Sequence, residues 1–309
     1  MQLVFCGTPQ FAVGTLEAVI AAGHRVSLVV TQPDRAAGRG LETHISAVKS
    51  AALRLHLPIA QPEKIKNNAE FREQLESLQP DAILVVAYGR IIPGWMLALP
   101  RFGCINLHGS LLPKYRGAAP IQWAVANGEQ ETGVTTMLLE AGLDTGPMLL
   151  AQKVPIDPDE TAEDLFESLA AIGAPLMVET LAGLQQGTVT PIAQDHTLAT
   201  LAPILTREDA RICPAQHTAQ HIYARWRGFQ PWPGAFTTLR GKKLIVHRMK
   251  PAEVCAPPSD LFVEQDRLFL GCASGAIELL EVQMEGKKRM SAAEFLHGYQ
   301  IKSGERVEG

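Results

Sequence analysis

Two polar side chains stand two residues apart inside an apolar run. They are Asn106 and His108, within Cys-Ile-Asn-Leu-His at 104–108. In a β-strand, residues two apart point to one face, so the amide and the imidazole would lie side by side. An amide can donate to a developing oxyanion, and an imidazole can relay a proton near neutral pH. The pair suits acyl transfer. The open alternative is an Asn and a His that satisfy backbone groups at a strand end.

A carboxylate downstream is the third candidate for chemistry. Asp144 stands in Gly-Leu-Asp-Thr-Gly at 142–146, after the apolar run 134–139. At the end of a neighbouring strand, this carboxylate could orient His108 and stabilise its charge, as the acid of a hydrolase triad does. The commoner role of such a turn Asp is to cap its own backbone. Both interpretations stay open at this point.

The segments that could supply other chemistry lack the required patterns. Ser110 is not embedded in G-x-S-x-G, so no nucleophile elbow is expected. Gly7 is followed by Thr-Pro-Gln-Phe, so the dinucleotide motif lacks its second and third glycines. We therefore expect direct attack by a substrate amine on an activated acyl group, without an acyl-enzyme or a nicotinamide cofactor.

The elements that must position these residues follow from apolar runs separated by turns. Runs that are apolar at every position suit parallel strands covered on both faces. Helical spacing follows the first run at 11–22. Repeated βα units predict a Rossmann-like, doubly wound and mainly parallel α/β sheet, with ligands at the carboxyl ends of its strands. The expected strands are 3–6, 26–31, 82–87, 104–108 and 134–139.

The second half of the chain changes character. Thr161 and Asp164 form a capping box that begins a helix, and residues 186–206 are polar without a clear period. Short strand-like runs with close turns then suggest a small barrel or sandwich. We predict a catalytic domain at 1–188, a linker at 189–206 and a β-barrel (OB-like) C-terminal domain at 207–309.

Composition and charge limit the function classes. The 309 residues are 46% hydrophobic and 19% charged, as in ordinary globular proteins. The five cysteines form no C-x-x-C pair, and we expect reduced thiols rather than disulfides or a zinc site. The first residues lack the basic and long apolar regions of a signal peptide. A cytoplasmic, metal-free enzyme without a membrane span, and a monomer by default, is the expectation.

Charge is distributed unevenly along the chain. Residues 1–206 carry a net charge of −7, whereas residues 207–309 carry +3. The basic second part favours a polyanionic partner, and the alternative is an ordinary surface with scattered lysines and arginines. Two basic clusters stand out there, Lys242-Lys243 and Lys287-Lys288-Arg289. Such clusters suit phosphate contacts, which supply sequence-independent affinity.

The chain resembles the bacterial methionyl-tRNA formyltransferase family, a branch of the folate-dependent formyltransferases. The Asn-x-His-x-Ser-Leu-Leu-Pro core is shared with the wider group, whereas Gln-Pro-Asp-Arg, Arg-Gly-Ala-Ala-Pro-Ile-Gln and Pro-Trp-Pro are more specific to the tRNA branch. The resemblance extends almost from end to end. Its segments are 4–9, 31–35, 37–40, 85–89, 105–117, 118–122, 131–135, 142–146, 229–233 and 286–288.

The resemblance implies formyl transfer from 10-formyltetrahydrofolate, a cosubstrate, to the amino group of methionyl-initiator tRNA. It implies Asn106, His108 and Asp144 as the catalytic set, without a metal. It also implies that the segment at 110–113 lines the folate site. The four residues of that segment are Ser110, Leu111, Leu112 and Pro113, with the Tyr88-Gly89 loop as a neighbour.

The resemblance further implies that the second domain holds the tRNA and that Arg39 approaches its acceptor end. Lys287 and Lys288 are the basic residues that we expect at its phosphates. This sequence departs from many relatives after Arg39-Gly40, where it reads Leu-Glu-Thr-His instead of lysines and prolines. We therefore expect a weaker phosphate contact from that loop.

Three other functions are compatible with the same residues. Water in place of the amine would give a formyltetrahydrofolate hydrolase, and a small amine such as an amino sugar or glycinamide would give a different formyltransferase. A basic second domain has no evident purpose for a small acceptor. A non-catalytic tRNA-binding module is the third alternative, but it leaves Asn106, His108 and Asp144 without a role.

Overall fold

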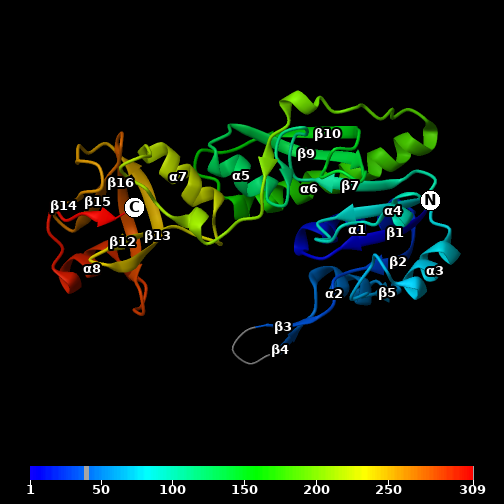
Figure 1. The fold of residues 1–309 in the computed structure, drawn as a ribbon, viewed down its shortest axis with the longest axis horizontal. Helices are drawn as coiled ribbons and strands as arrows, with labels where there is room; N and C mark the ends of the chain where they lie inside the picture. Colours follow the sequence, from blue (N-terminus) through cyan, green and yellow to red (C-terminus); the bar gives the residue numbers. More distant parts are fainter. Residues whose placement is uncertain (38–41, 309) are drawn as a thin grey trace. The chain divides into compact units, whose positions relative to one another are not determined.

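The computed structural model describes residues 1–37 and 42–308, which form two compact units (Figure 1). The chain crosses between the units several times, so each unit contains separate stretches of sequence. Unit 1 consists of Met1–Pro120, Glu131–Pro155 and Phe166–Pro203. Unit 2 consists of Ile121–Gln130, Ile156–Leu165 and Ile204–Gly309.

The main sheet of unit 1 has seven strands. They are β1 (Gln2–Gly7), β2 (Arg25–Val30), β5 (Ile59–Ala60), β6 (Ala82–Val86), β7 (Cys104–His108), β9 (Glu131–Leu138) and β10 (Met148–Pro155). Their order is β10-β9-β7-β6-β1-β2-β5. Strands β7, β6, β1, β2 and β5 are parallel to one another. Strand β9 is antiparallel to β7, and β10 is antiparallel to β9. The predicted mainly parallel, doubly wound sheet is confirmed.

Helices cover both faces of this sheet. The helical segments of unit 1 are η1 (Gln10–Ala12), α1 (Val13–Ala21), α2 (Ala47–Arg54), α3 (Ala69–Leu78), α4 (Gly94–Leu97) and most of α6 (Ala162–Gln186). On one face, Phe71 of α3 and Met96 of α4 join a core cluster with Val4 and Ile83 of the sheet. On the other face, Gly173 of α6 lies so close to Leu107 that an added Cβ would stand 2.7 Å from its Cδ2.

Burial on both faces explains why the central strands are apolar at every position. Strands β6 and β7 are buried at every residue. A strand with one face in the core and the other in solvent would instead alternate between buried and exposed residues. The expected helix at 11–22 instead begins with η1, a short 3₁₀ turn, and continues as α1. Strand β10 is not among the predicted strands; most of its residues are exposed or half-buried, and its apolar run is limited to Met-Leu-Leu-Ala at 148–151.

Helix α6 begins at the predicted capping box. The Thr161 hydroxyl accepts from the Asp164 N–H at 3.3 Å, and the Asp164 carboxylate accepts from the Thr161 N–H at 3.0 Å. By length and apolar composition alone, α6 is the one helix in the described ranges that could cross a membrane. Its residues Leu165, Leu169 and Leu181 are fully buried within the fold, which is the pattern of a core helix.

Short elements of unit 1 flank the main sheet. The hairpin of β3 (Arg35–Ala37) and β4 (Glu42–His44) follows β2. The predicted linker contains η2 (His196–Leu198) and β11 (Leu201–Ala202). Strand β11 pairs in parallel with β8 (Arg116–Gly117), so this stretch hydrogen-bonds to the loop that follows β7.

Unit 2 is built around a curled antiparallel sheet. Its elements are α5 (Pro120–Ala126, all but its first residue), η3 (Glu208–Ala210), α7 (Ala219–Gly228), β12 (Phe236–Leu239), β13 (Lys242–Ala252), β14 (Leu261–Glu264), β15 (Arg267–Gly271), β16 (Ala276–Met284), β17 (Met290–Ser291), α8 (Ala292–Tyr299) and β18 (Val307–Glu308). The strand order is β14-β15-β16-β13-β12-β18.

The sheet of unit 2 curls until its two ends meet. Register shifts in β13 opposite β16 mark bulges, which bend a strand and increase its twist. The N–H of Gly304 then donates to the Leu261 carbonyl (2.9 Å), and that of Val307 donates to the Ser259 carbonyl (2.9 Å). Phe295 of α8 is fully buried in the core that this curled sheet encloses. The predicted small barrel in the second half is confirmed.

Candidate active site

Asn106 and His108 lie on one face of β7, at its carboxyl end. Both side chains are buried, with 9% and 5% of the residue surfaces exposed. In register, Asn106 stands opposite Met137 of β9, and His108 stands opposite Thr135. Within residues 1–37 and 42–308, no hydrogen bond engages the Asn106 side-chain amide. Its N–H groups are therefore available to a bound acyl oxygen.

Both nitrogens of the His108 ring face oxygen atoms. The Nε2 atom is 2.9 Å from the Tyr115 carbonyl oxygen, and the Nδ1 atom is 3.7 Å from Oδ2 of Asp144. Because a carbonyl oxygen only accepts, we assign the hydrogen of the neutral ring to Nε2. Nδ1 is then the nitrogen that can take up a proton, and it does so beside a carboxylate.

Asp144 lies in the tight turn between β9 and β10. Its Oδ2 accepts the Gly117 N–H at 2.8 Å, and its backbone has the left-handed φ of 47°. Gly146 makes the turn possible, because an added Cβ would stand 2.0 Å from the Leu138 carbonyl oxygen. The structure thus brings Asp144 to His108, and it does not use this carboxylate merely to cap the Asp144 turn.

The thiol nearest to the pair on β7 is not poised as a nucleophile. Cys104 precedes Asn106 by two residues and is almost fully buried. Burial raises the pKa of its thiol to about 12, so the thiol stays protonated at neutral pH. This agrees with chemistry that proceeds without an acyl-enzyme.

The predicted folate segment forms the loop directly after β7. Ser110 is fully buried, and its hydroxyl donates to the Lys114 carbonyl at 2.6 Å, so it holds the loop in shape. Leu112 is buried and its peptide bond to Pro113 is cis. Leu111 and Pro113 are half-buried and are the more exposed members of the segment.

The loops that follow the parallel strands converge on one backbone group. The carbonyl of Tyr88, after β6, accepts from the Thr8 hydroxyl (3.2 Å) after β1 and from the Gln32 amide (2.9 Å) after β2. Gly89 has a φ of 75°, and a Cβ there would stand 2.7 Å from Nε2 of Gln32. Burial raises the pKa of the Tyr88 hydroxyl, so Tyr88 acts as packing rather than as an acid.

The base of the β3–β4 hairpin is anchored by charge. The Asp34 carboxylate accepts from the Lys49 ammonium and from the Gln61 amide, the latter at 2.8 Å. The hydrogen bond from Lys49, followed by that from Gln61, lowers the pKa of Asp34. Arg39, a predicted tRNA contact, lies outside the described residues.

Lys287 and Lys288 are exposed in the turn between β16 and β17. Neither ammonium forms an ion pair with a carboxylate in the described ranges. The adjacent Arg289 differs, because Glu281 binds its guanidinium. In the other basic cluster, the Lys243 ammonium lies 3.6 Å from the centroid of the Phe236 ring.

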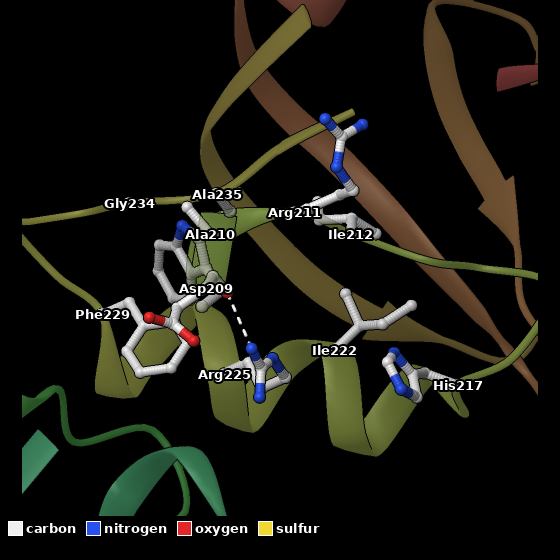
Figure 2. Close-up of a pocket in the computed structure, with 11 residues that line it drawn as sticks. Asp209, Ala210, Arg211, Ile212, His217, Ile222, Arg225, Phe229, Gly234 and Ala235 are labelled. Atoms are coloured by element: carbon white, nitrogen blue, oxygen red, sulfur yellow. Dashed lines mark hydrogen bonds between the residues drawn. The ribbon is translucent and has the colours of Figure 1, made fainter. Parts of the chain in front are cut away.

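Figure 2 shows a small pocket of unit 2 between α7 and the segments 209–212 and 234–235. Arg225 donates to the Asp209 carbonyl at 2.7 Å, which the dashed line marks. Burial, followed by the charge of Arg225, lowers the pKa of His217 on its rim. None of the residues predicted for catalysis or binding lines this pocket. Among the described residues, no group of three or more His, Cys, Asp and Glu side chains could hold a metal ion.

Comparison with known protein families accounts for both halves of the chain. A model described as formyl transferase matches residues 1–181, and one described as formyl transferase, C-terminal domain, matches residues 204–300. The chain belongs to the formyl transferase family. The resemblance drawn from the motifs is thereby confirmed. Asn106, His108 and Asp144 all lie inside the first matched segment.

Individual formyl transferases are similar over nearly the full length. The chain is 64% identical to the methionyl-tRNA formyltransferase of Acidobacterium capsulatum over 301 residues, covering 96% of each chain. It is 56% identical to the protein of that name from Koribacter versatilis, covering 99% of this chain and 98% of the relative.

Solved formyl transferase structures share the fold at low sequence identity. An N-formyltransferase from Helicobacter canadensis, in complex with folinic acid and dTDP-3-aminofucose, matches with a TM-score of 0.65 at 17% identity, covering 91% of this chain and 98% of its own. HypX from Aquifex aeolicus, in complex with tetrahydrofolic acid, matches with a TM-score of 0.64 at 16% identity, covering 97% of this chain and 47% of its own.

Two residues of this formyl transferase fold were not singled out from the sequence. Gln194 and the Arg116 side chain are buried, and they hydrogen-bond to each other next to the Asp144 turn. Gln194 stands in a polar stretch without periodicity, between the two segments that the family models match. No pattern in the sequence distinguishes it from an exposed linker residue.

Proposed function

We propose that the chain transfers the formyl group of 10-formyltetrahydrofolate to the free amino group of methionyl-initiator tRNA. The observation that carries this proposal is similarity over both units to relatives named methionyl-tRNA formyltransferase, at 64% and 56% identity. A second unit does not by itself select the acceptor, because the N-formyltransferase in complex with dTDP-3-aminofucose also covers 91% of this chain, at 17% identity.

In the proposed reaction the neutral amine of the methionyl group attacks the formyl carbon. The carbonyl oxygen becomes an oxyanion in a tetrahedral intermediate, and the Asn106 amide donates a hydrogen bond to it. The bond from carbon to N10 then breaks as the carbonyl re-forms. The amine loses one proton and N10 gains one, so the reaction releases tetrahydrofolate and consumes no net proton.

His108 is the group that we assign to this proton transfer. Its Nε2 is engaged by the Tyr115 carbonyl, which leaves Nδ1 to receive the proton and return it. The Asp144 carboxylate, 3.7 Å from Nδ1, stabilises the positive ring in between. The Gly117 N–H holds the same carboxylate oxygen and keeps it in place.

Substrate contacts follow the same division of the chain. We assign the folate to the loop at 110–113, with Leu111 and Pro113 as its more exposed members. We assign tRNA contacts to Arg39, Lys287 and Lys288. In this proposal residues 1–188 act as the catalytic domain, 189–206 connect, and 207–309 bind tRNA.

The proposed reaction needs no membrane, no second subunit and no metal. Asn106 supplies the oxyanion contact, and His108 supplies the proton transfer. We place it in the cytoplasm, where aminoacylated tRNA enters translation and where free cysteines stay reduced. The five cysteines of the chain are all free.

An acceptor panel tests the proposal. The purified chain is given formyl-labelled 10-formyltetrahydrofolate with charged initiator tRNA, charged elongator methionine tRNA, an amino sugar nucleotide, glycinamide ribonucleotide, or water alone. We expect label on the methionine of the initiator tRNA. Label released as formate without any acceptor would identify a hydrolase, and label on a small amine would identify a different transferase. Binding of tRNA without loss of formyl would identify a non-catalytic module.

A further inference from the structure

The segment after α6 binds back onto the loop that carries the site. Ile192 forms an antiparallel bridge with Met148, with both N–H···O distances at 2.8 Å. The Thr200 hydroxyl accepts the Tyr115 N–H (2.8 Å), and the Thr200 carbonyl accepts the Arg116 N–H (2.8 Å). The segment is therefore part of the scaffold of unit 1 and is not merely a passage out of it.

Gln194 is the one buried polar residue of this segment, with 5% of its surface exposed. Its Nε2 donates to the carbonyls of Asp144 (2.9 Å) and Gly146 (2.7 Å). Its Oε1 accepts from Nε (3.0 Å) and Nη2 (2.6 Å) of Arg116. Both amide hydrogens and both oxygen lone pairs are satisfied. The reversed amide would set an oxygen against two carbonyls, so the orientation is determined.

Arg116 depends on this amide because its guanidinium is buried, with 6% of the residue exposed. Its other partner is Nδ1 of His196, 3.0 Å away, and within the described ranges it forms no ion pair with a carboxylate. A buried charge is costly unless it is hydrogen-bonded, so Arg116 and Gln194 hold each other in one arrangement.

The backbone beside Arg116 holds both members of the proposed proton-transfer pair. The Tyr115 carbonyl accepts from His108, and the Gly117 N–H donates to Asp144. Gln194 hydrogen-bonds both to the Arg116 side chain and to the Asp144 carbonyl. The result is a closed ring of hydrogen bonds that runs through Asp144, Gln194, Arg116 and Gly117.

We propose that Gln194 is a positioning residue for formyl transfer, which sets the distance between the Asp144 carboxylate and His108. This inference rests on the proposed function. The gap from Nδ1 to Oδ2 is 3.7 Å, just beyond a hydrogen bond, so a shift of a few tenths of an ångström decides whether the pair closes. Gln194 touches neither reacting group, and it acts through the turn that carries Asp144.

Two substitutions separate a positioning role of Gln194 from a role in stability alone. Gln194→Glu keeps an oxygen for Arg116 but loses both donors to the carbonyls of Asp144 and Gly146. Gln194→Met loses both sets of contacts. Gln185→Glu, at the exposed end of α6, is the matched control. Formylation kinetics with both substrates and thermal melting are measured on the full chain.

We expect kcat to fall by about 10- to 100-fold in both Gln194 variants, with KM for tRNA and for the folate within about twofold of wild type. Gln194→Met should melt at the lower temperature of the two, because it alone also removes the acceptor of the buried Arg116 guanidinium. Unchanged kcat in Gln194→Glu overturns the inference, and so does a kcat loss that appears only in a variant that melts early.

A second readout separates this inference from the proposed function. The side-chain NMR resonances of His108 are compared between wild type, Gln194→Glu and Gln185→Glu, in the absence of substrates. We expect them to shift in Gln194→Glu alone, even if the wild-type chain formylates no tRNA. Resonances identical to those of wild type in Gln194→Glu overturn the positioning role.

Discussion

At the scale of single residues, the backbone at 115–117 decides what His108 and Asp144 can do. The Tyr115 carbonyl engages Nε2 of the His108 ring, and the Gly117 N–H donates to the Asp144 carboxylate. Proton transfer is thereby assigned to a single ring nitrogen, Nδ1. The side chains alone would leave either nitrogen free to act.

The tautomer of His108 is the first expected outcome. When the ring is neutral, its hydrogen should sit on Nε2, because the Tyr115 carbonyl can only accept a hydrogen bond. Long-range proton–nitrogen NMR on histidine-labelled protein measures this directly, with His108→Gln to assign the signal. A neutral ring with the hydrogen on Nδ1 would contradict the assignment of roles.

Substitution of Asn106 gives a second prediction. Removal of one oxyanion donor typically lowers kcat by about 10²- to 10³-fold, so we expect a loss of this size in Asn106→Ala. Affinity for tRNA should stay close to wild type, because Asn106 contacts the reacting centre alone. Steady-state kinetics and tRNA binding are compared with Asn67→Ala, an exposed control. Lost tRNA binding with normal turnover would refute the role.

The sequence predicts the reacting residues better than the residues that hold them. Asn106 and His108 could be found because a spacing of two within a strand puts two side chains on one face. Asp144 could be placed because it follows an apolar run. Gln194 could not be found, because its role depends on contacts with residues about 50 and 80 positions away.

At the scale of elements, prediction succeeds where burial is complete on both faces. Strands β6 and β7 are fully buried, and the strands predicted from their apolar runs, 82–87 and 104–108, agree with the observed bounds to within one residue. Strand β10 lies at a sheet edge with exposed residues, and β8 and β11 have two residues each. Such elements form through tertiary hydrogen bonds rather than through a local pattern.

A cross-strand clamp in unit 2 gives a prediction on stability. Glu278 of β16 accepts from Arg267 of β15 at 2.9 and 2.8 Å, and it stands opposite Lys250 of β13 in register. Hydrogen bonds from Arg267 are the largest cause that lowers the pKa of Glu278 below 4.5. A lowered carboxyl pKa stabilises the fold above the unfolded pKa, and this stability is lost as the pH falls through the folded value.

We therefore expect Glu278→Gln to lower the free energy of unfolding by about 2 kcal/mol at pH 7. The difference in the free energy of unfolding between the variant and wild type should shrink as the pH falls below about 4.5, where wild-type Glu278 also becomes neutral. Urea unfolding from pH 7 to pH 3 measures this difference, with the exposed Glu285→Gln as control. A gap that stays constant with pH would contradict the clamp.

At the scale of the whole molecule, carboxylates neutralise much of the positive charge of unit 2. Ion pairs engage Arg240 (2.8 Å), Lys250 (3.4 Å) and Arg306 (3.1 Å), among others. The turn with Lys287 and Lys288 differs, since its ammonium groups have no such partner among the described residues. A count of lysines and arginines therefore overstates the charge that unit 2 offers to a polyanion.

The double variant Lys287→Ala/Lys288→Ala tests whether these two lysines contact the tRNA. If both lysines meet phosphates, KM for tRNA should rise several-fold, and the salt dependence of log Kd should become shallower by about 2. The turnover number kcat should not change. A pair of exposed lysines on unit 1, Lys64 and Lys66, gives the matched control. An unchanged salt slope would remove these two residues from the proposed tRNA contacts.

The most direct test of formyl transfer through His108 follows the formyl group through one turnover. Labelled 10-formyltetrahydrofolate and charged initiator tRNA are mixed with excess enzyme, quenched at set times, and counted as formyl-methionyl-tRNA and as formate, for wild type and His108→Asn. We expect wild type to deliver the label to tRNA, and His108→Asn to bind both substrates but to transfer the formyl group about 10²- to 10⁴-fold more slowly. Equal rates in the two proteins, or label appearing as formate in wild type, would contradict this expectation.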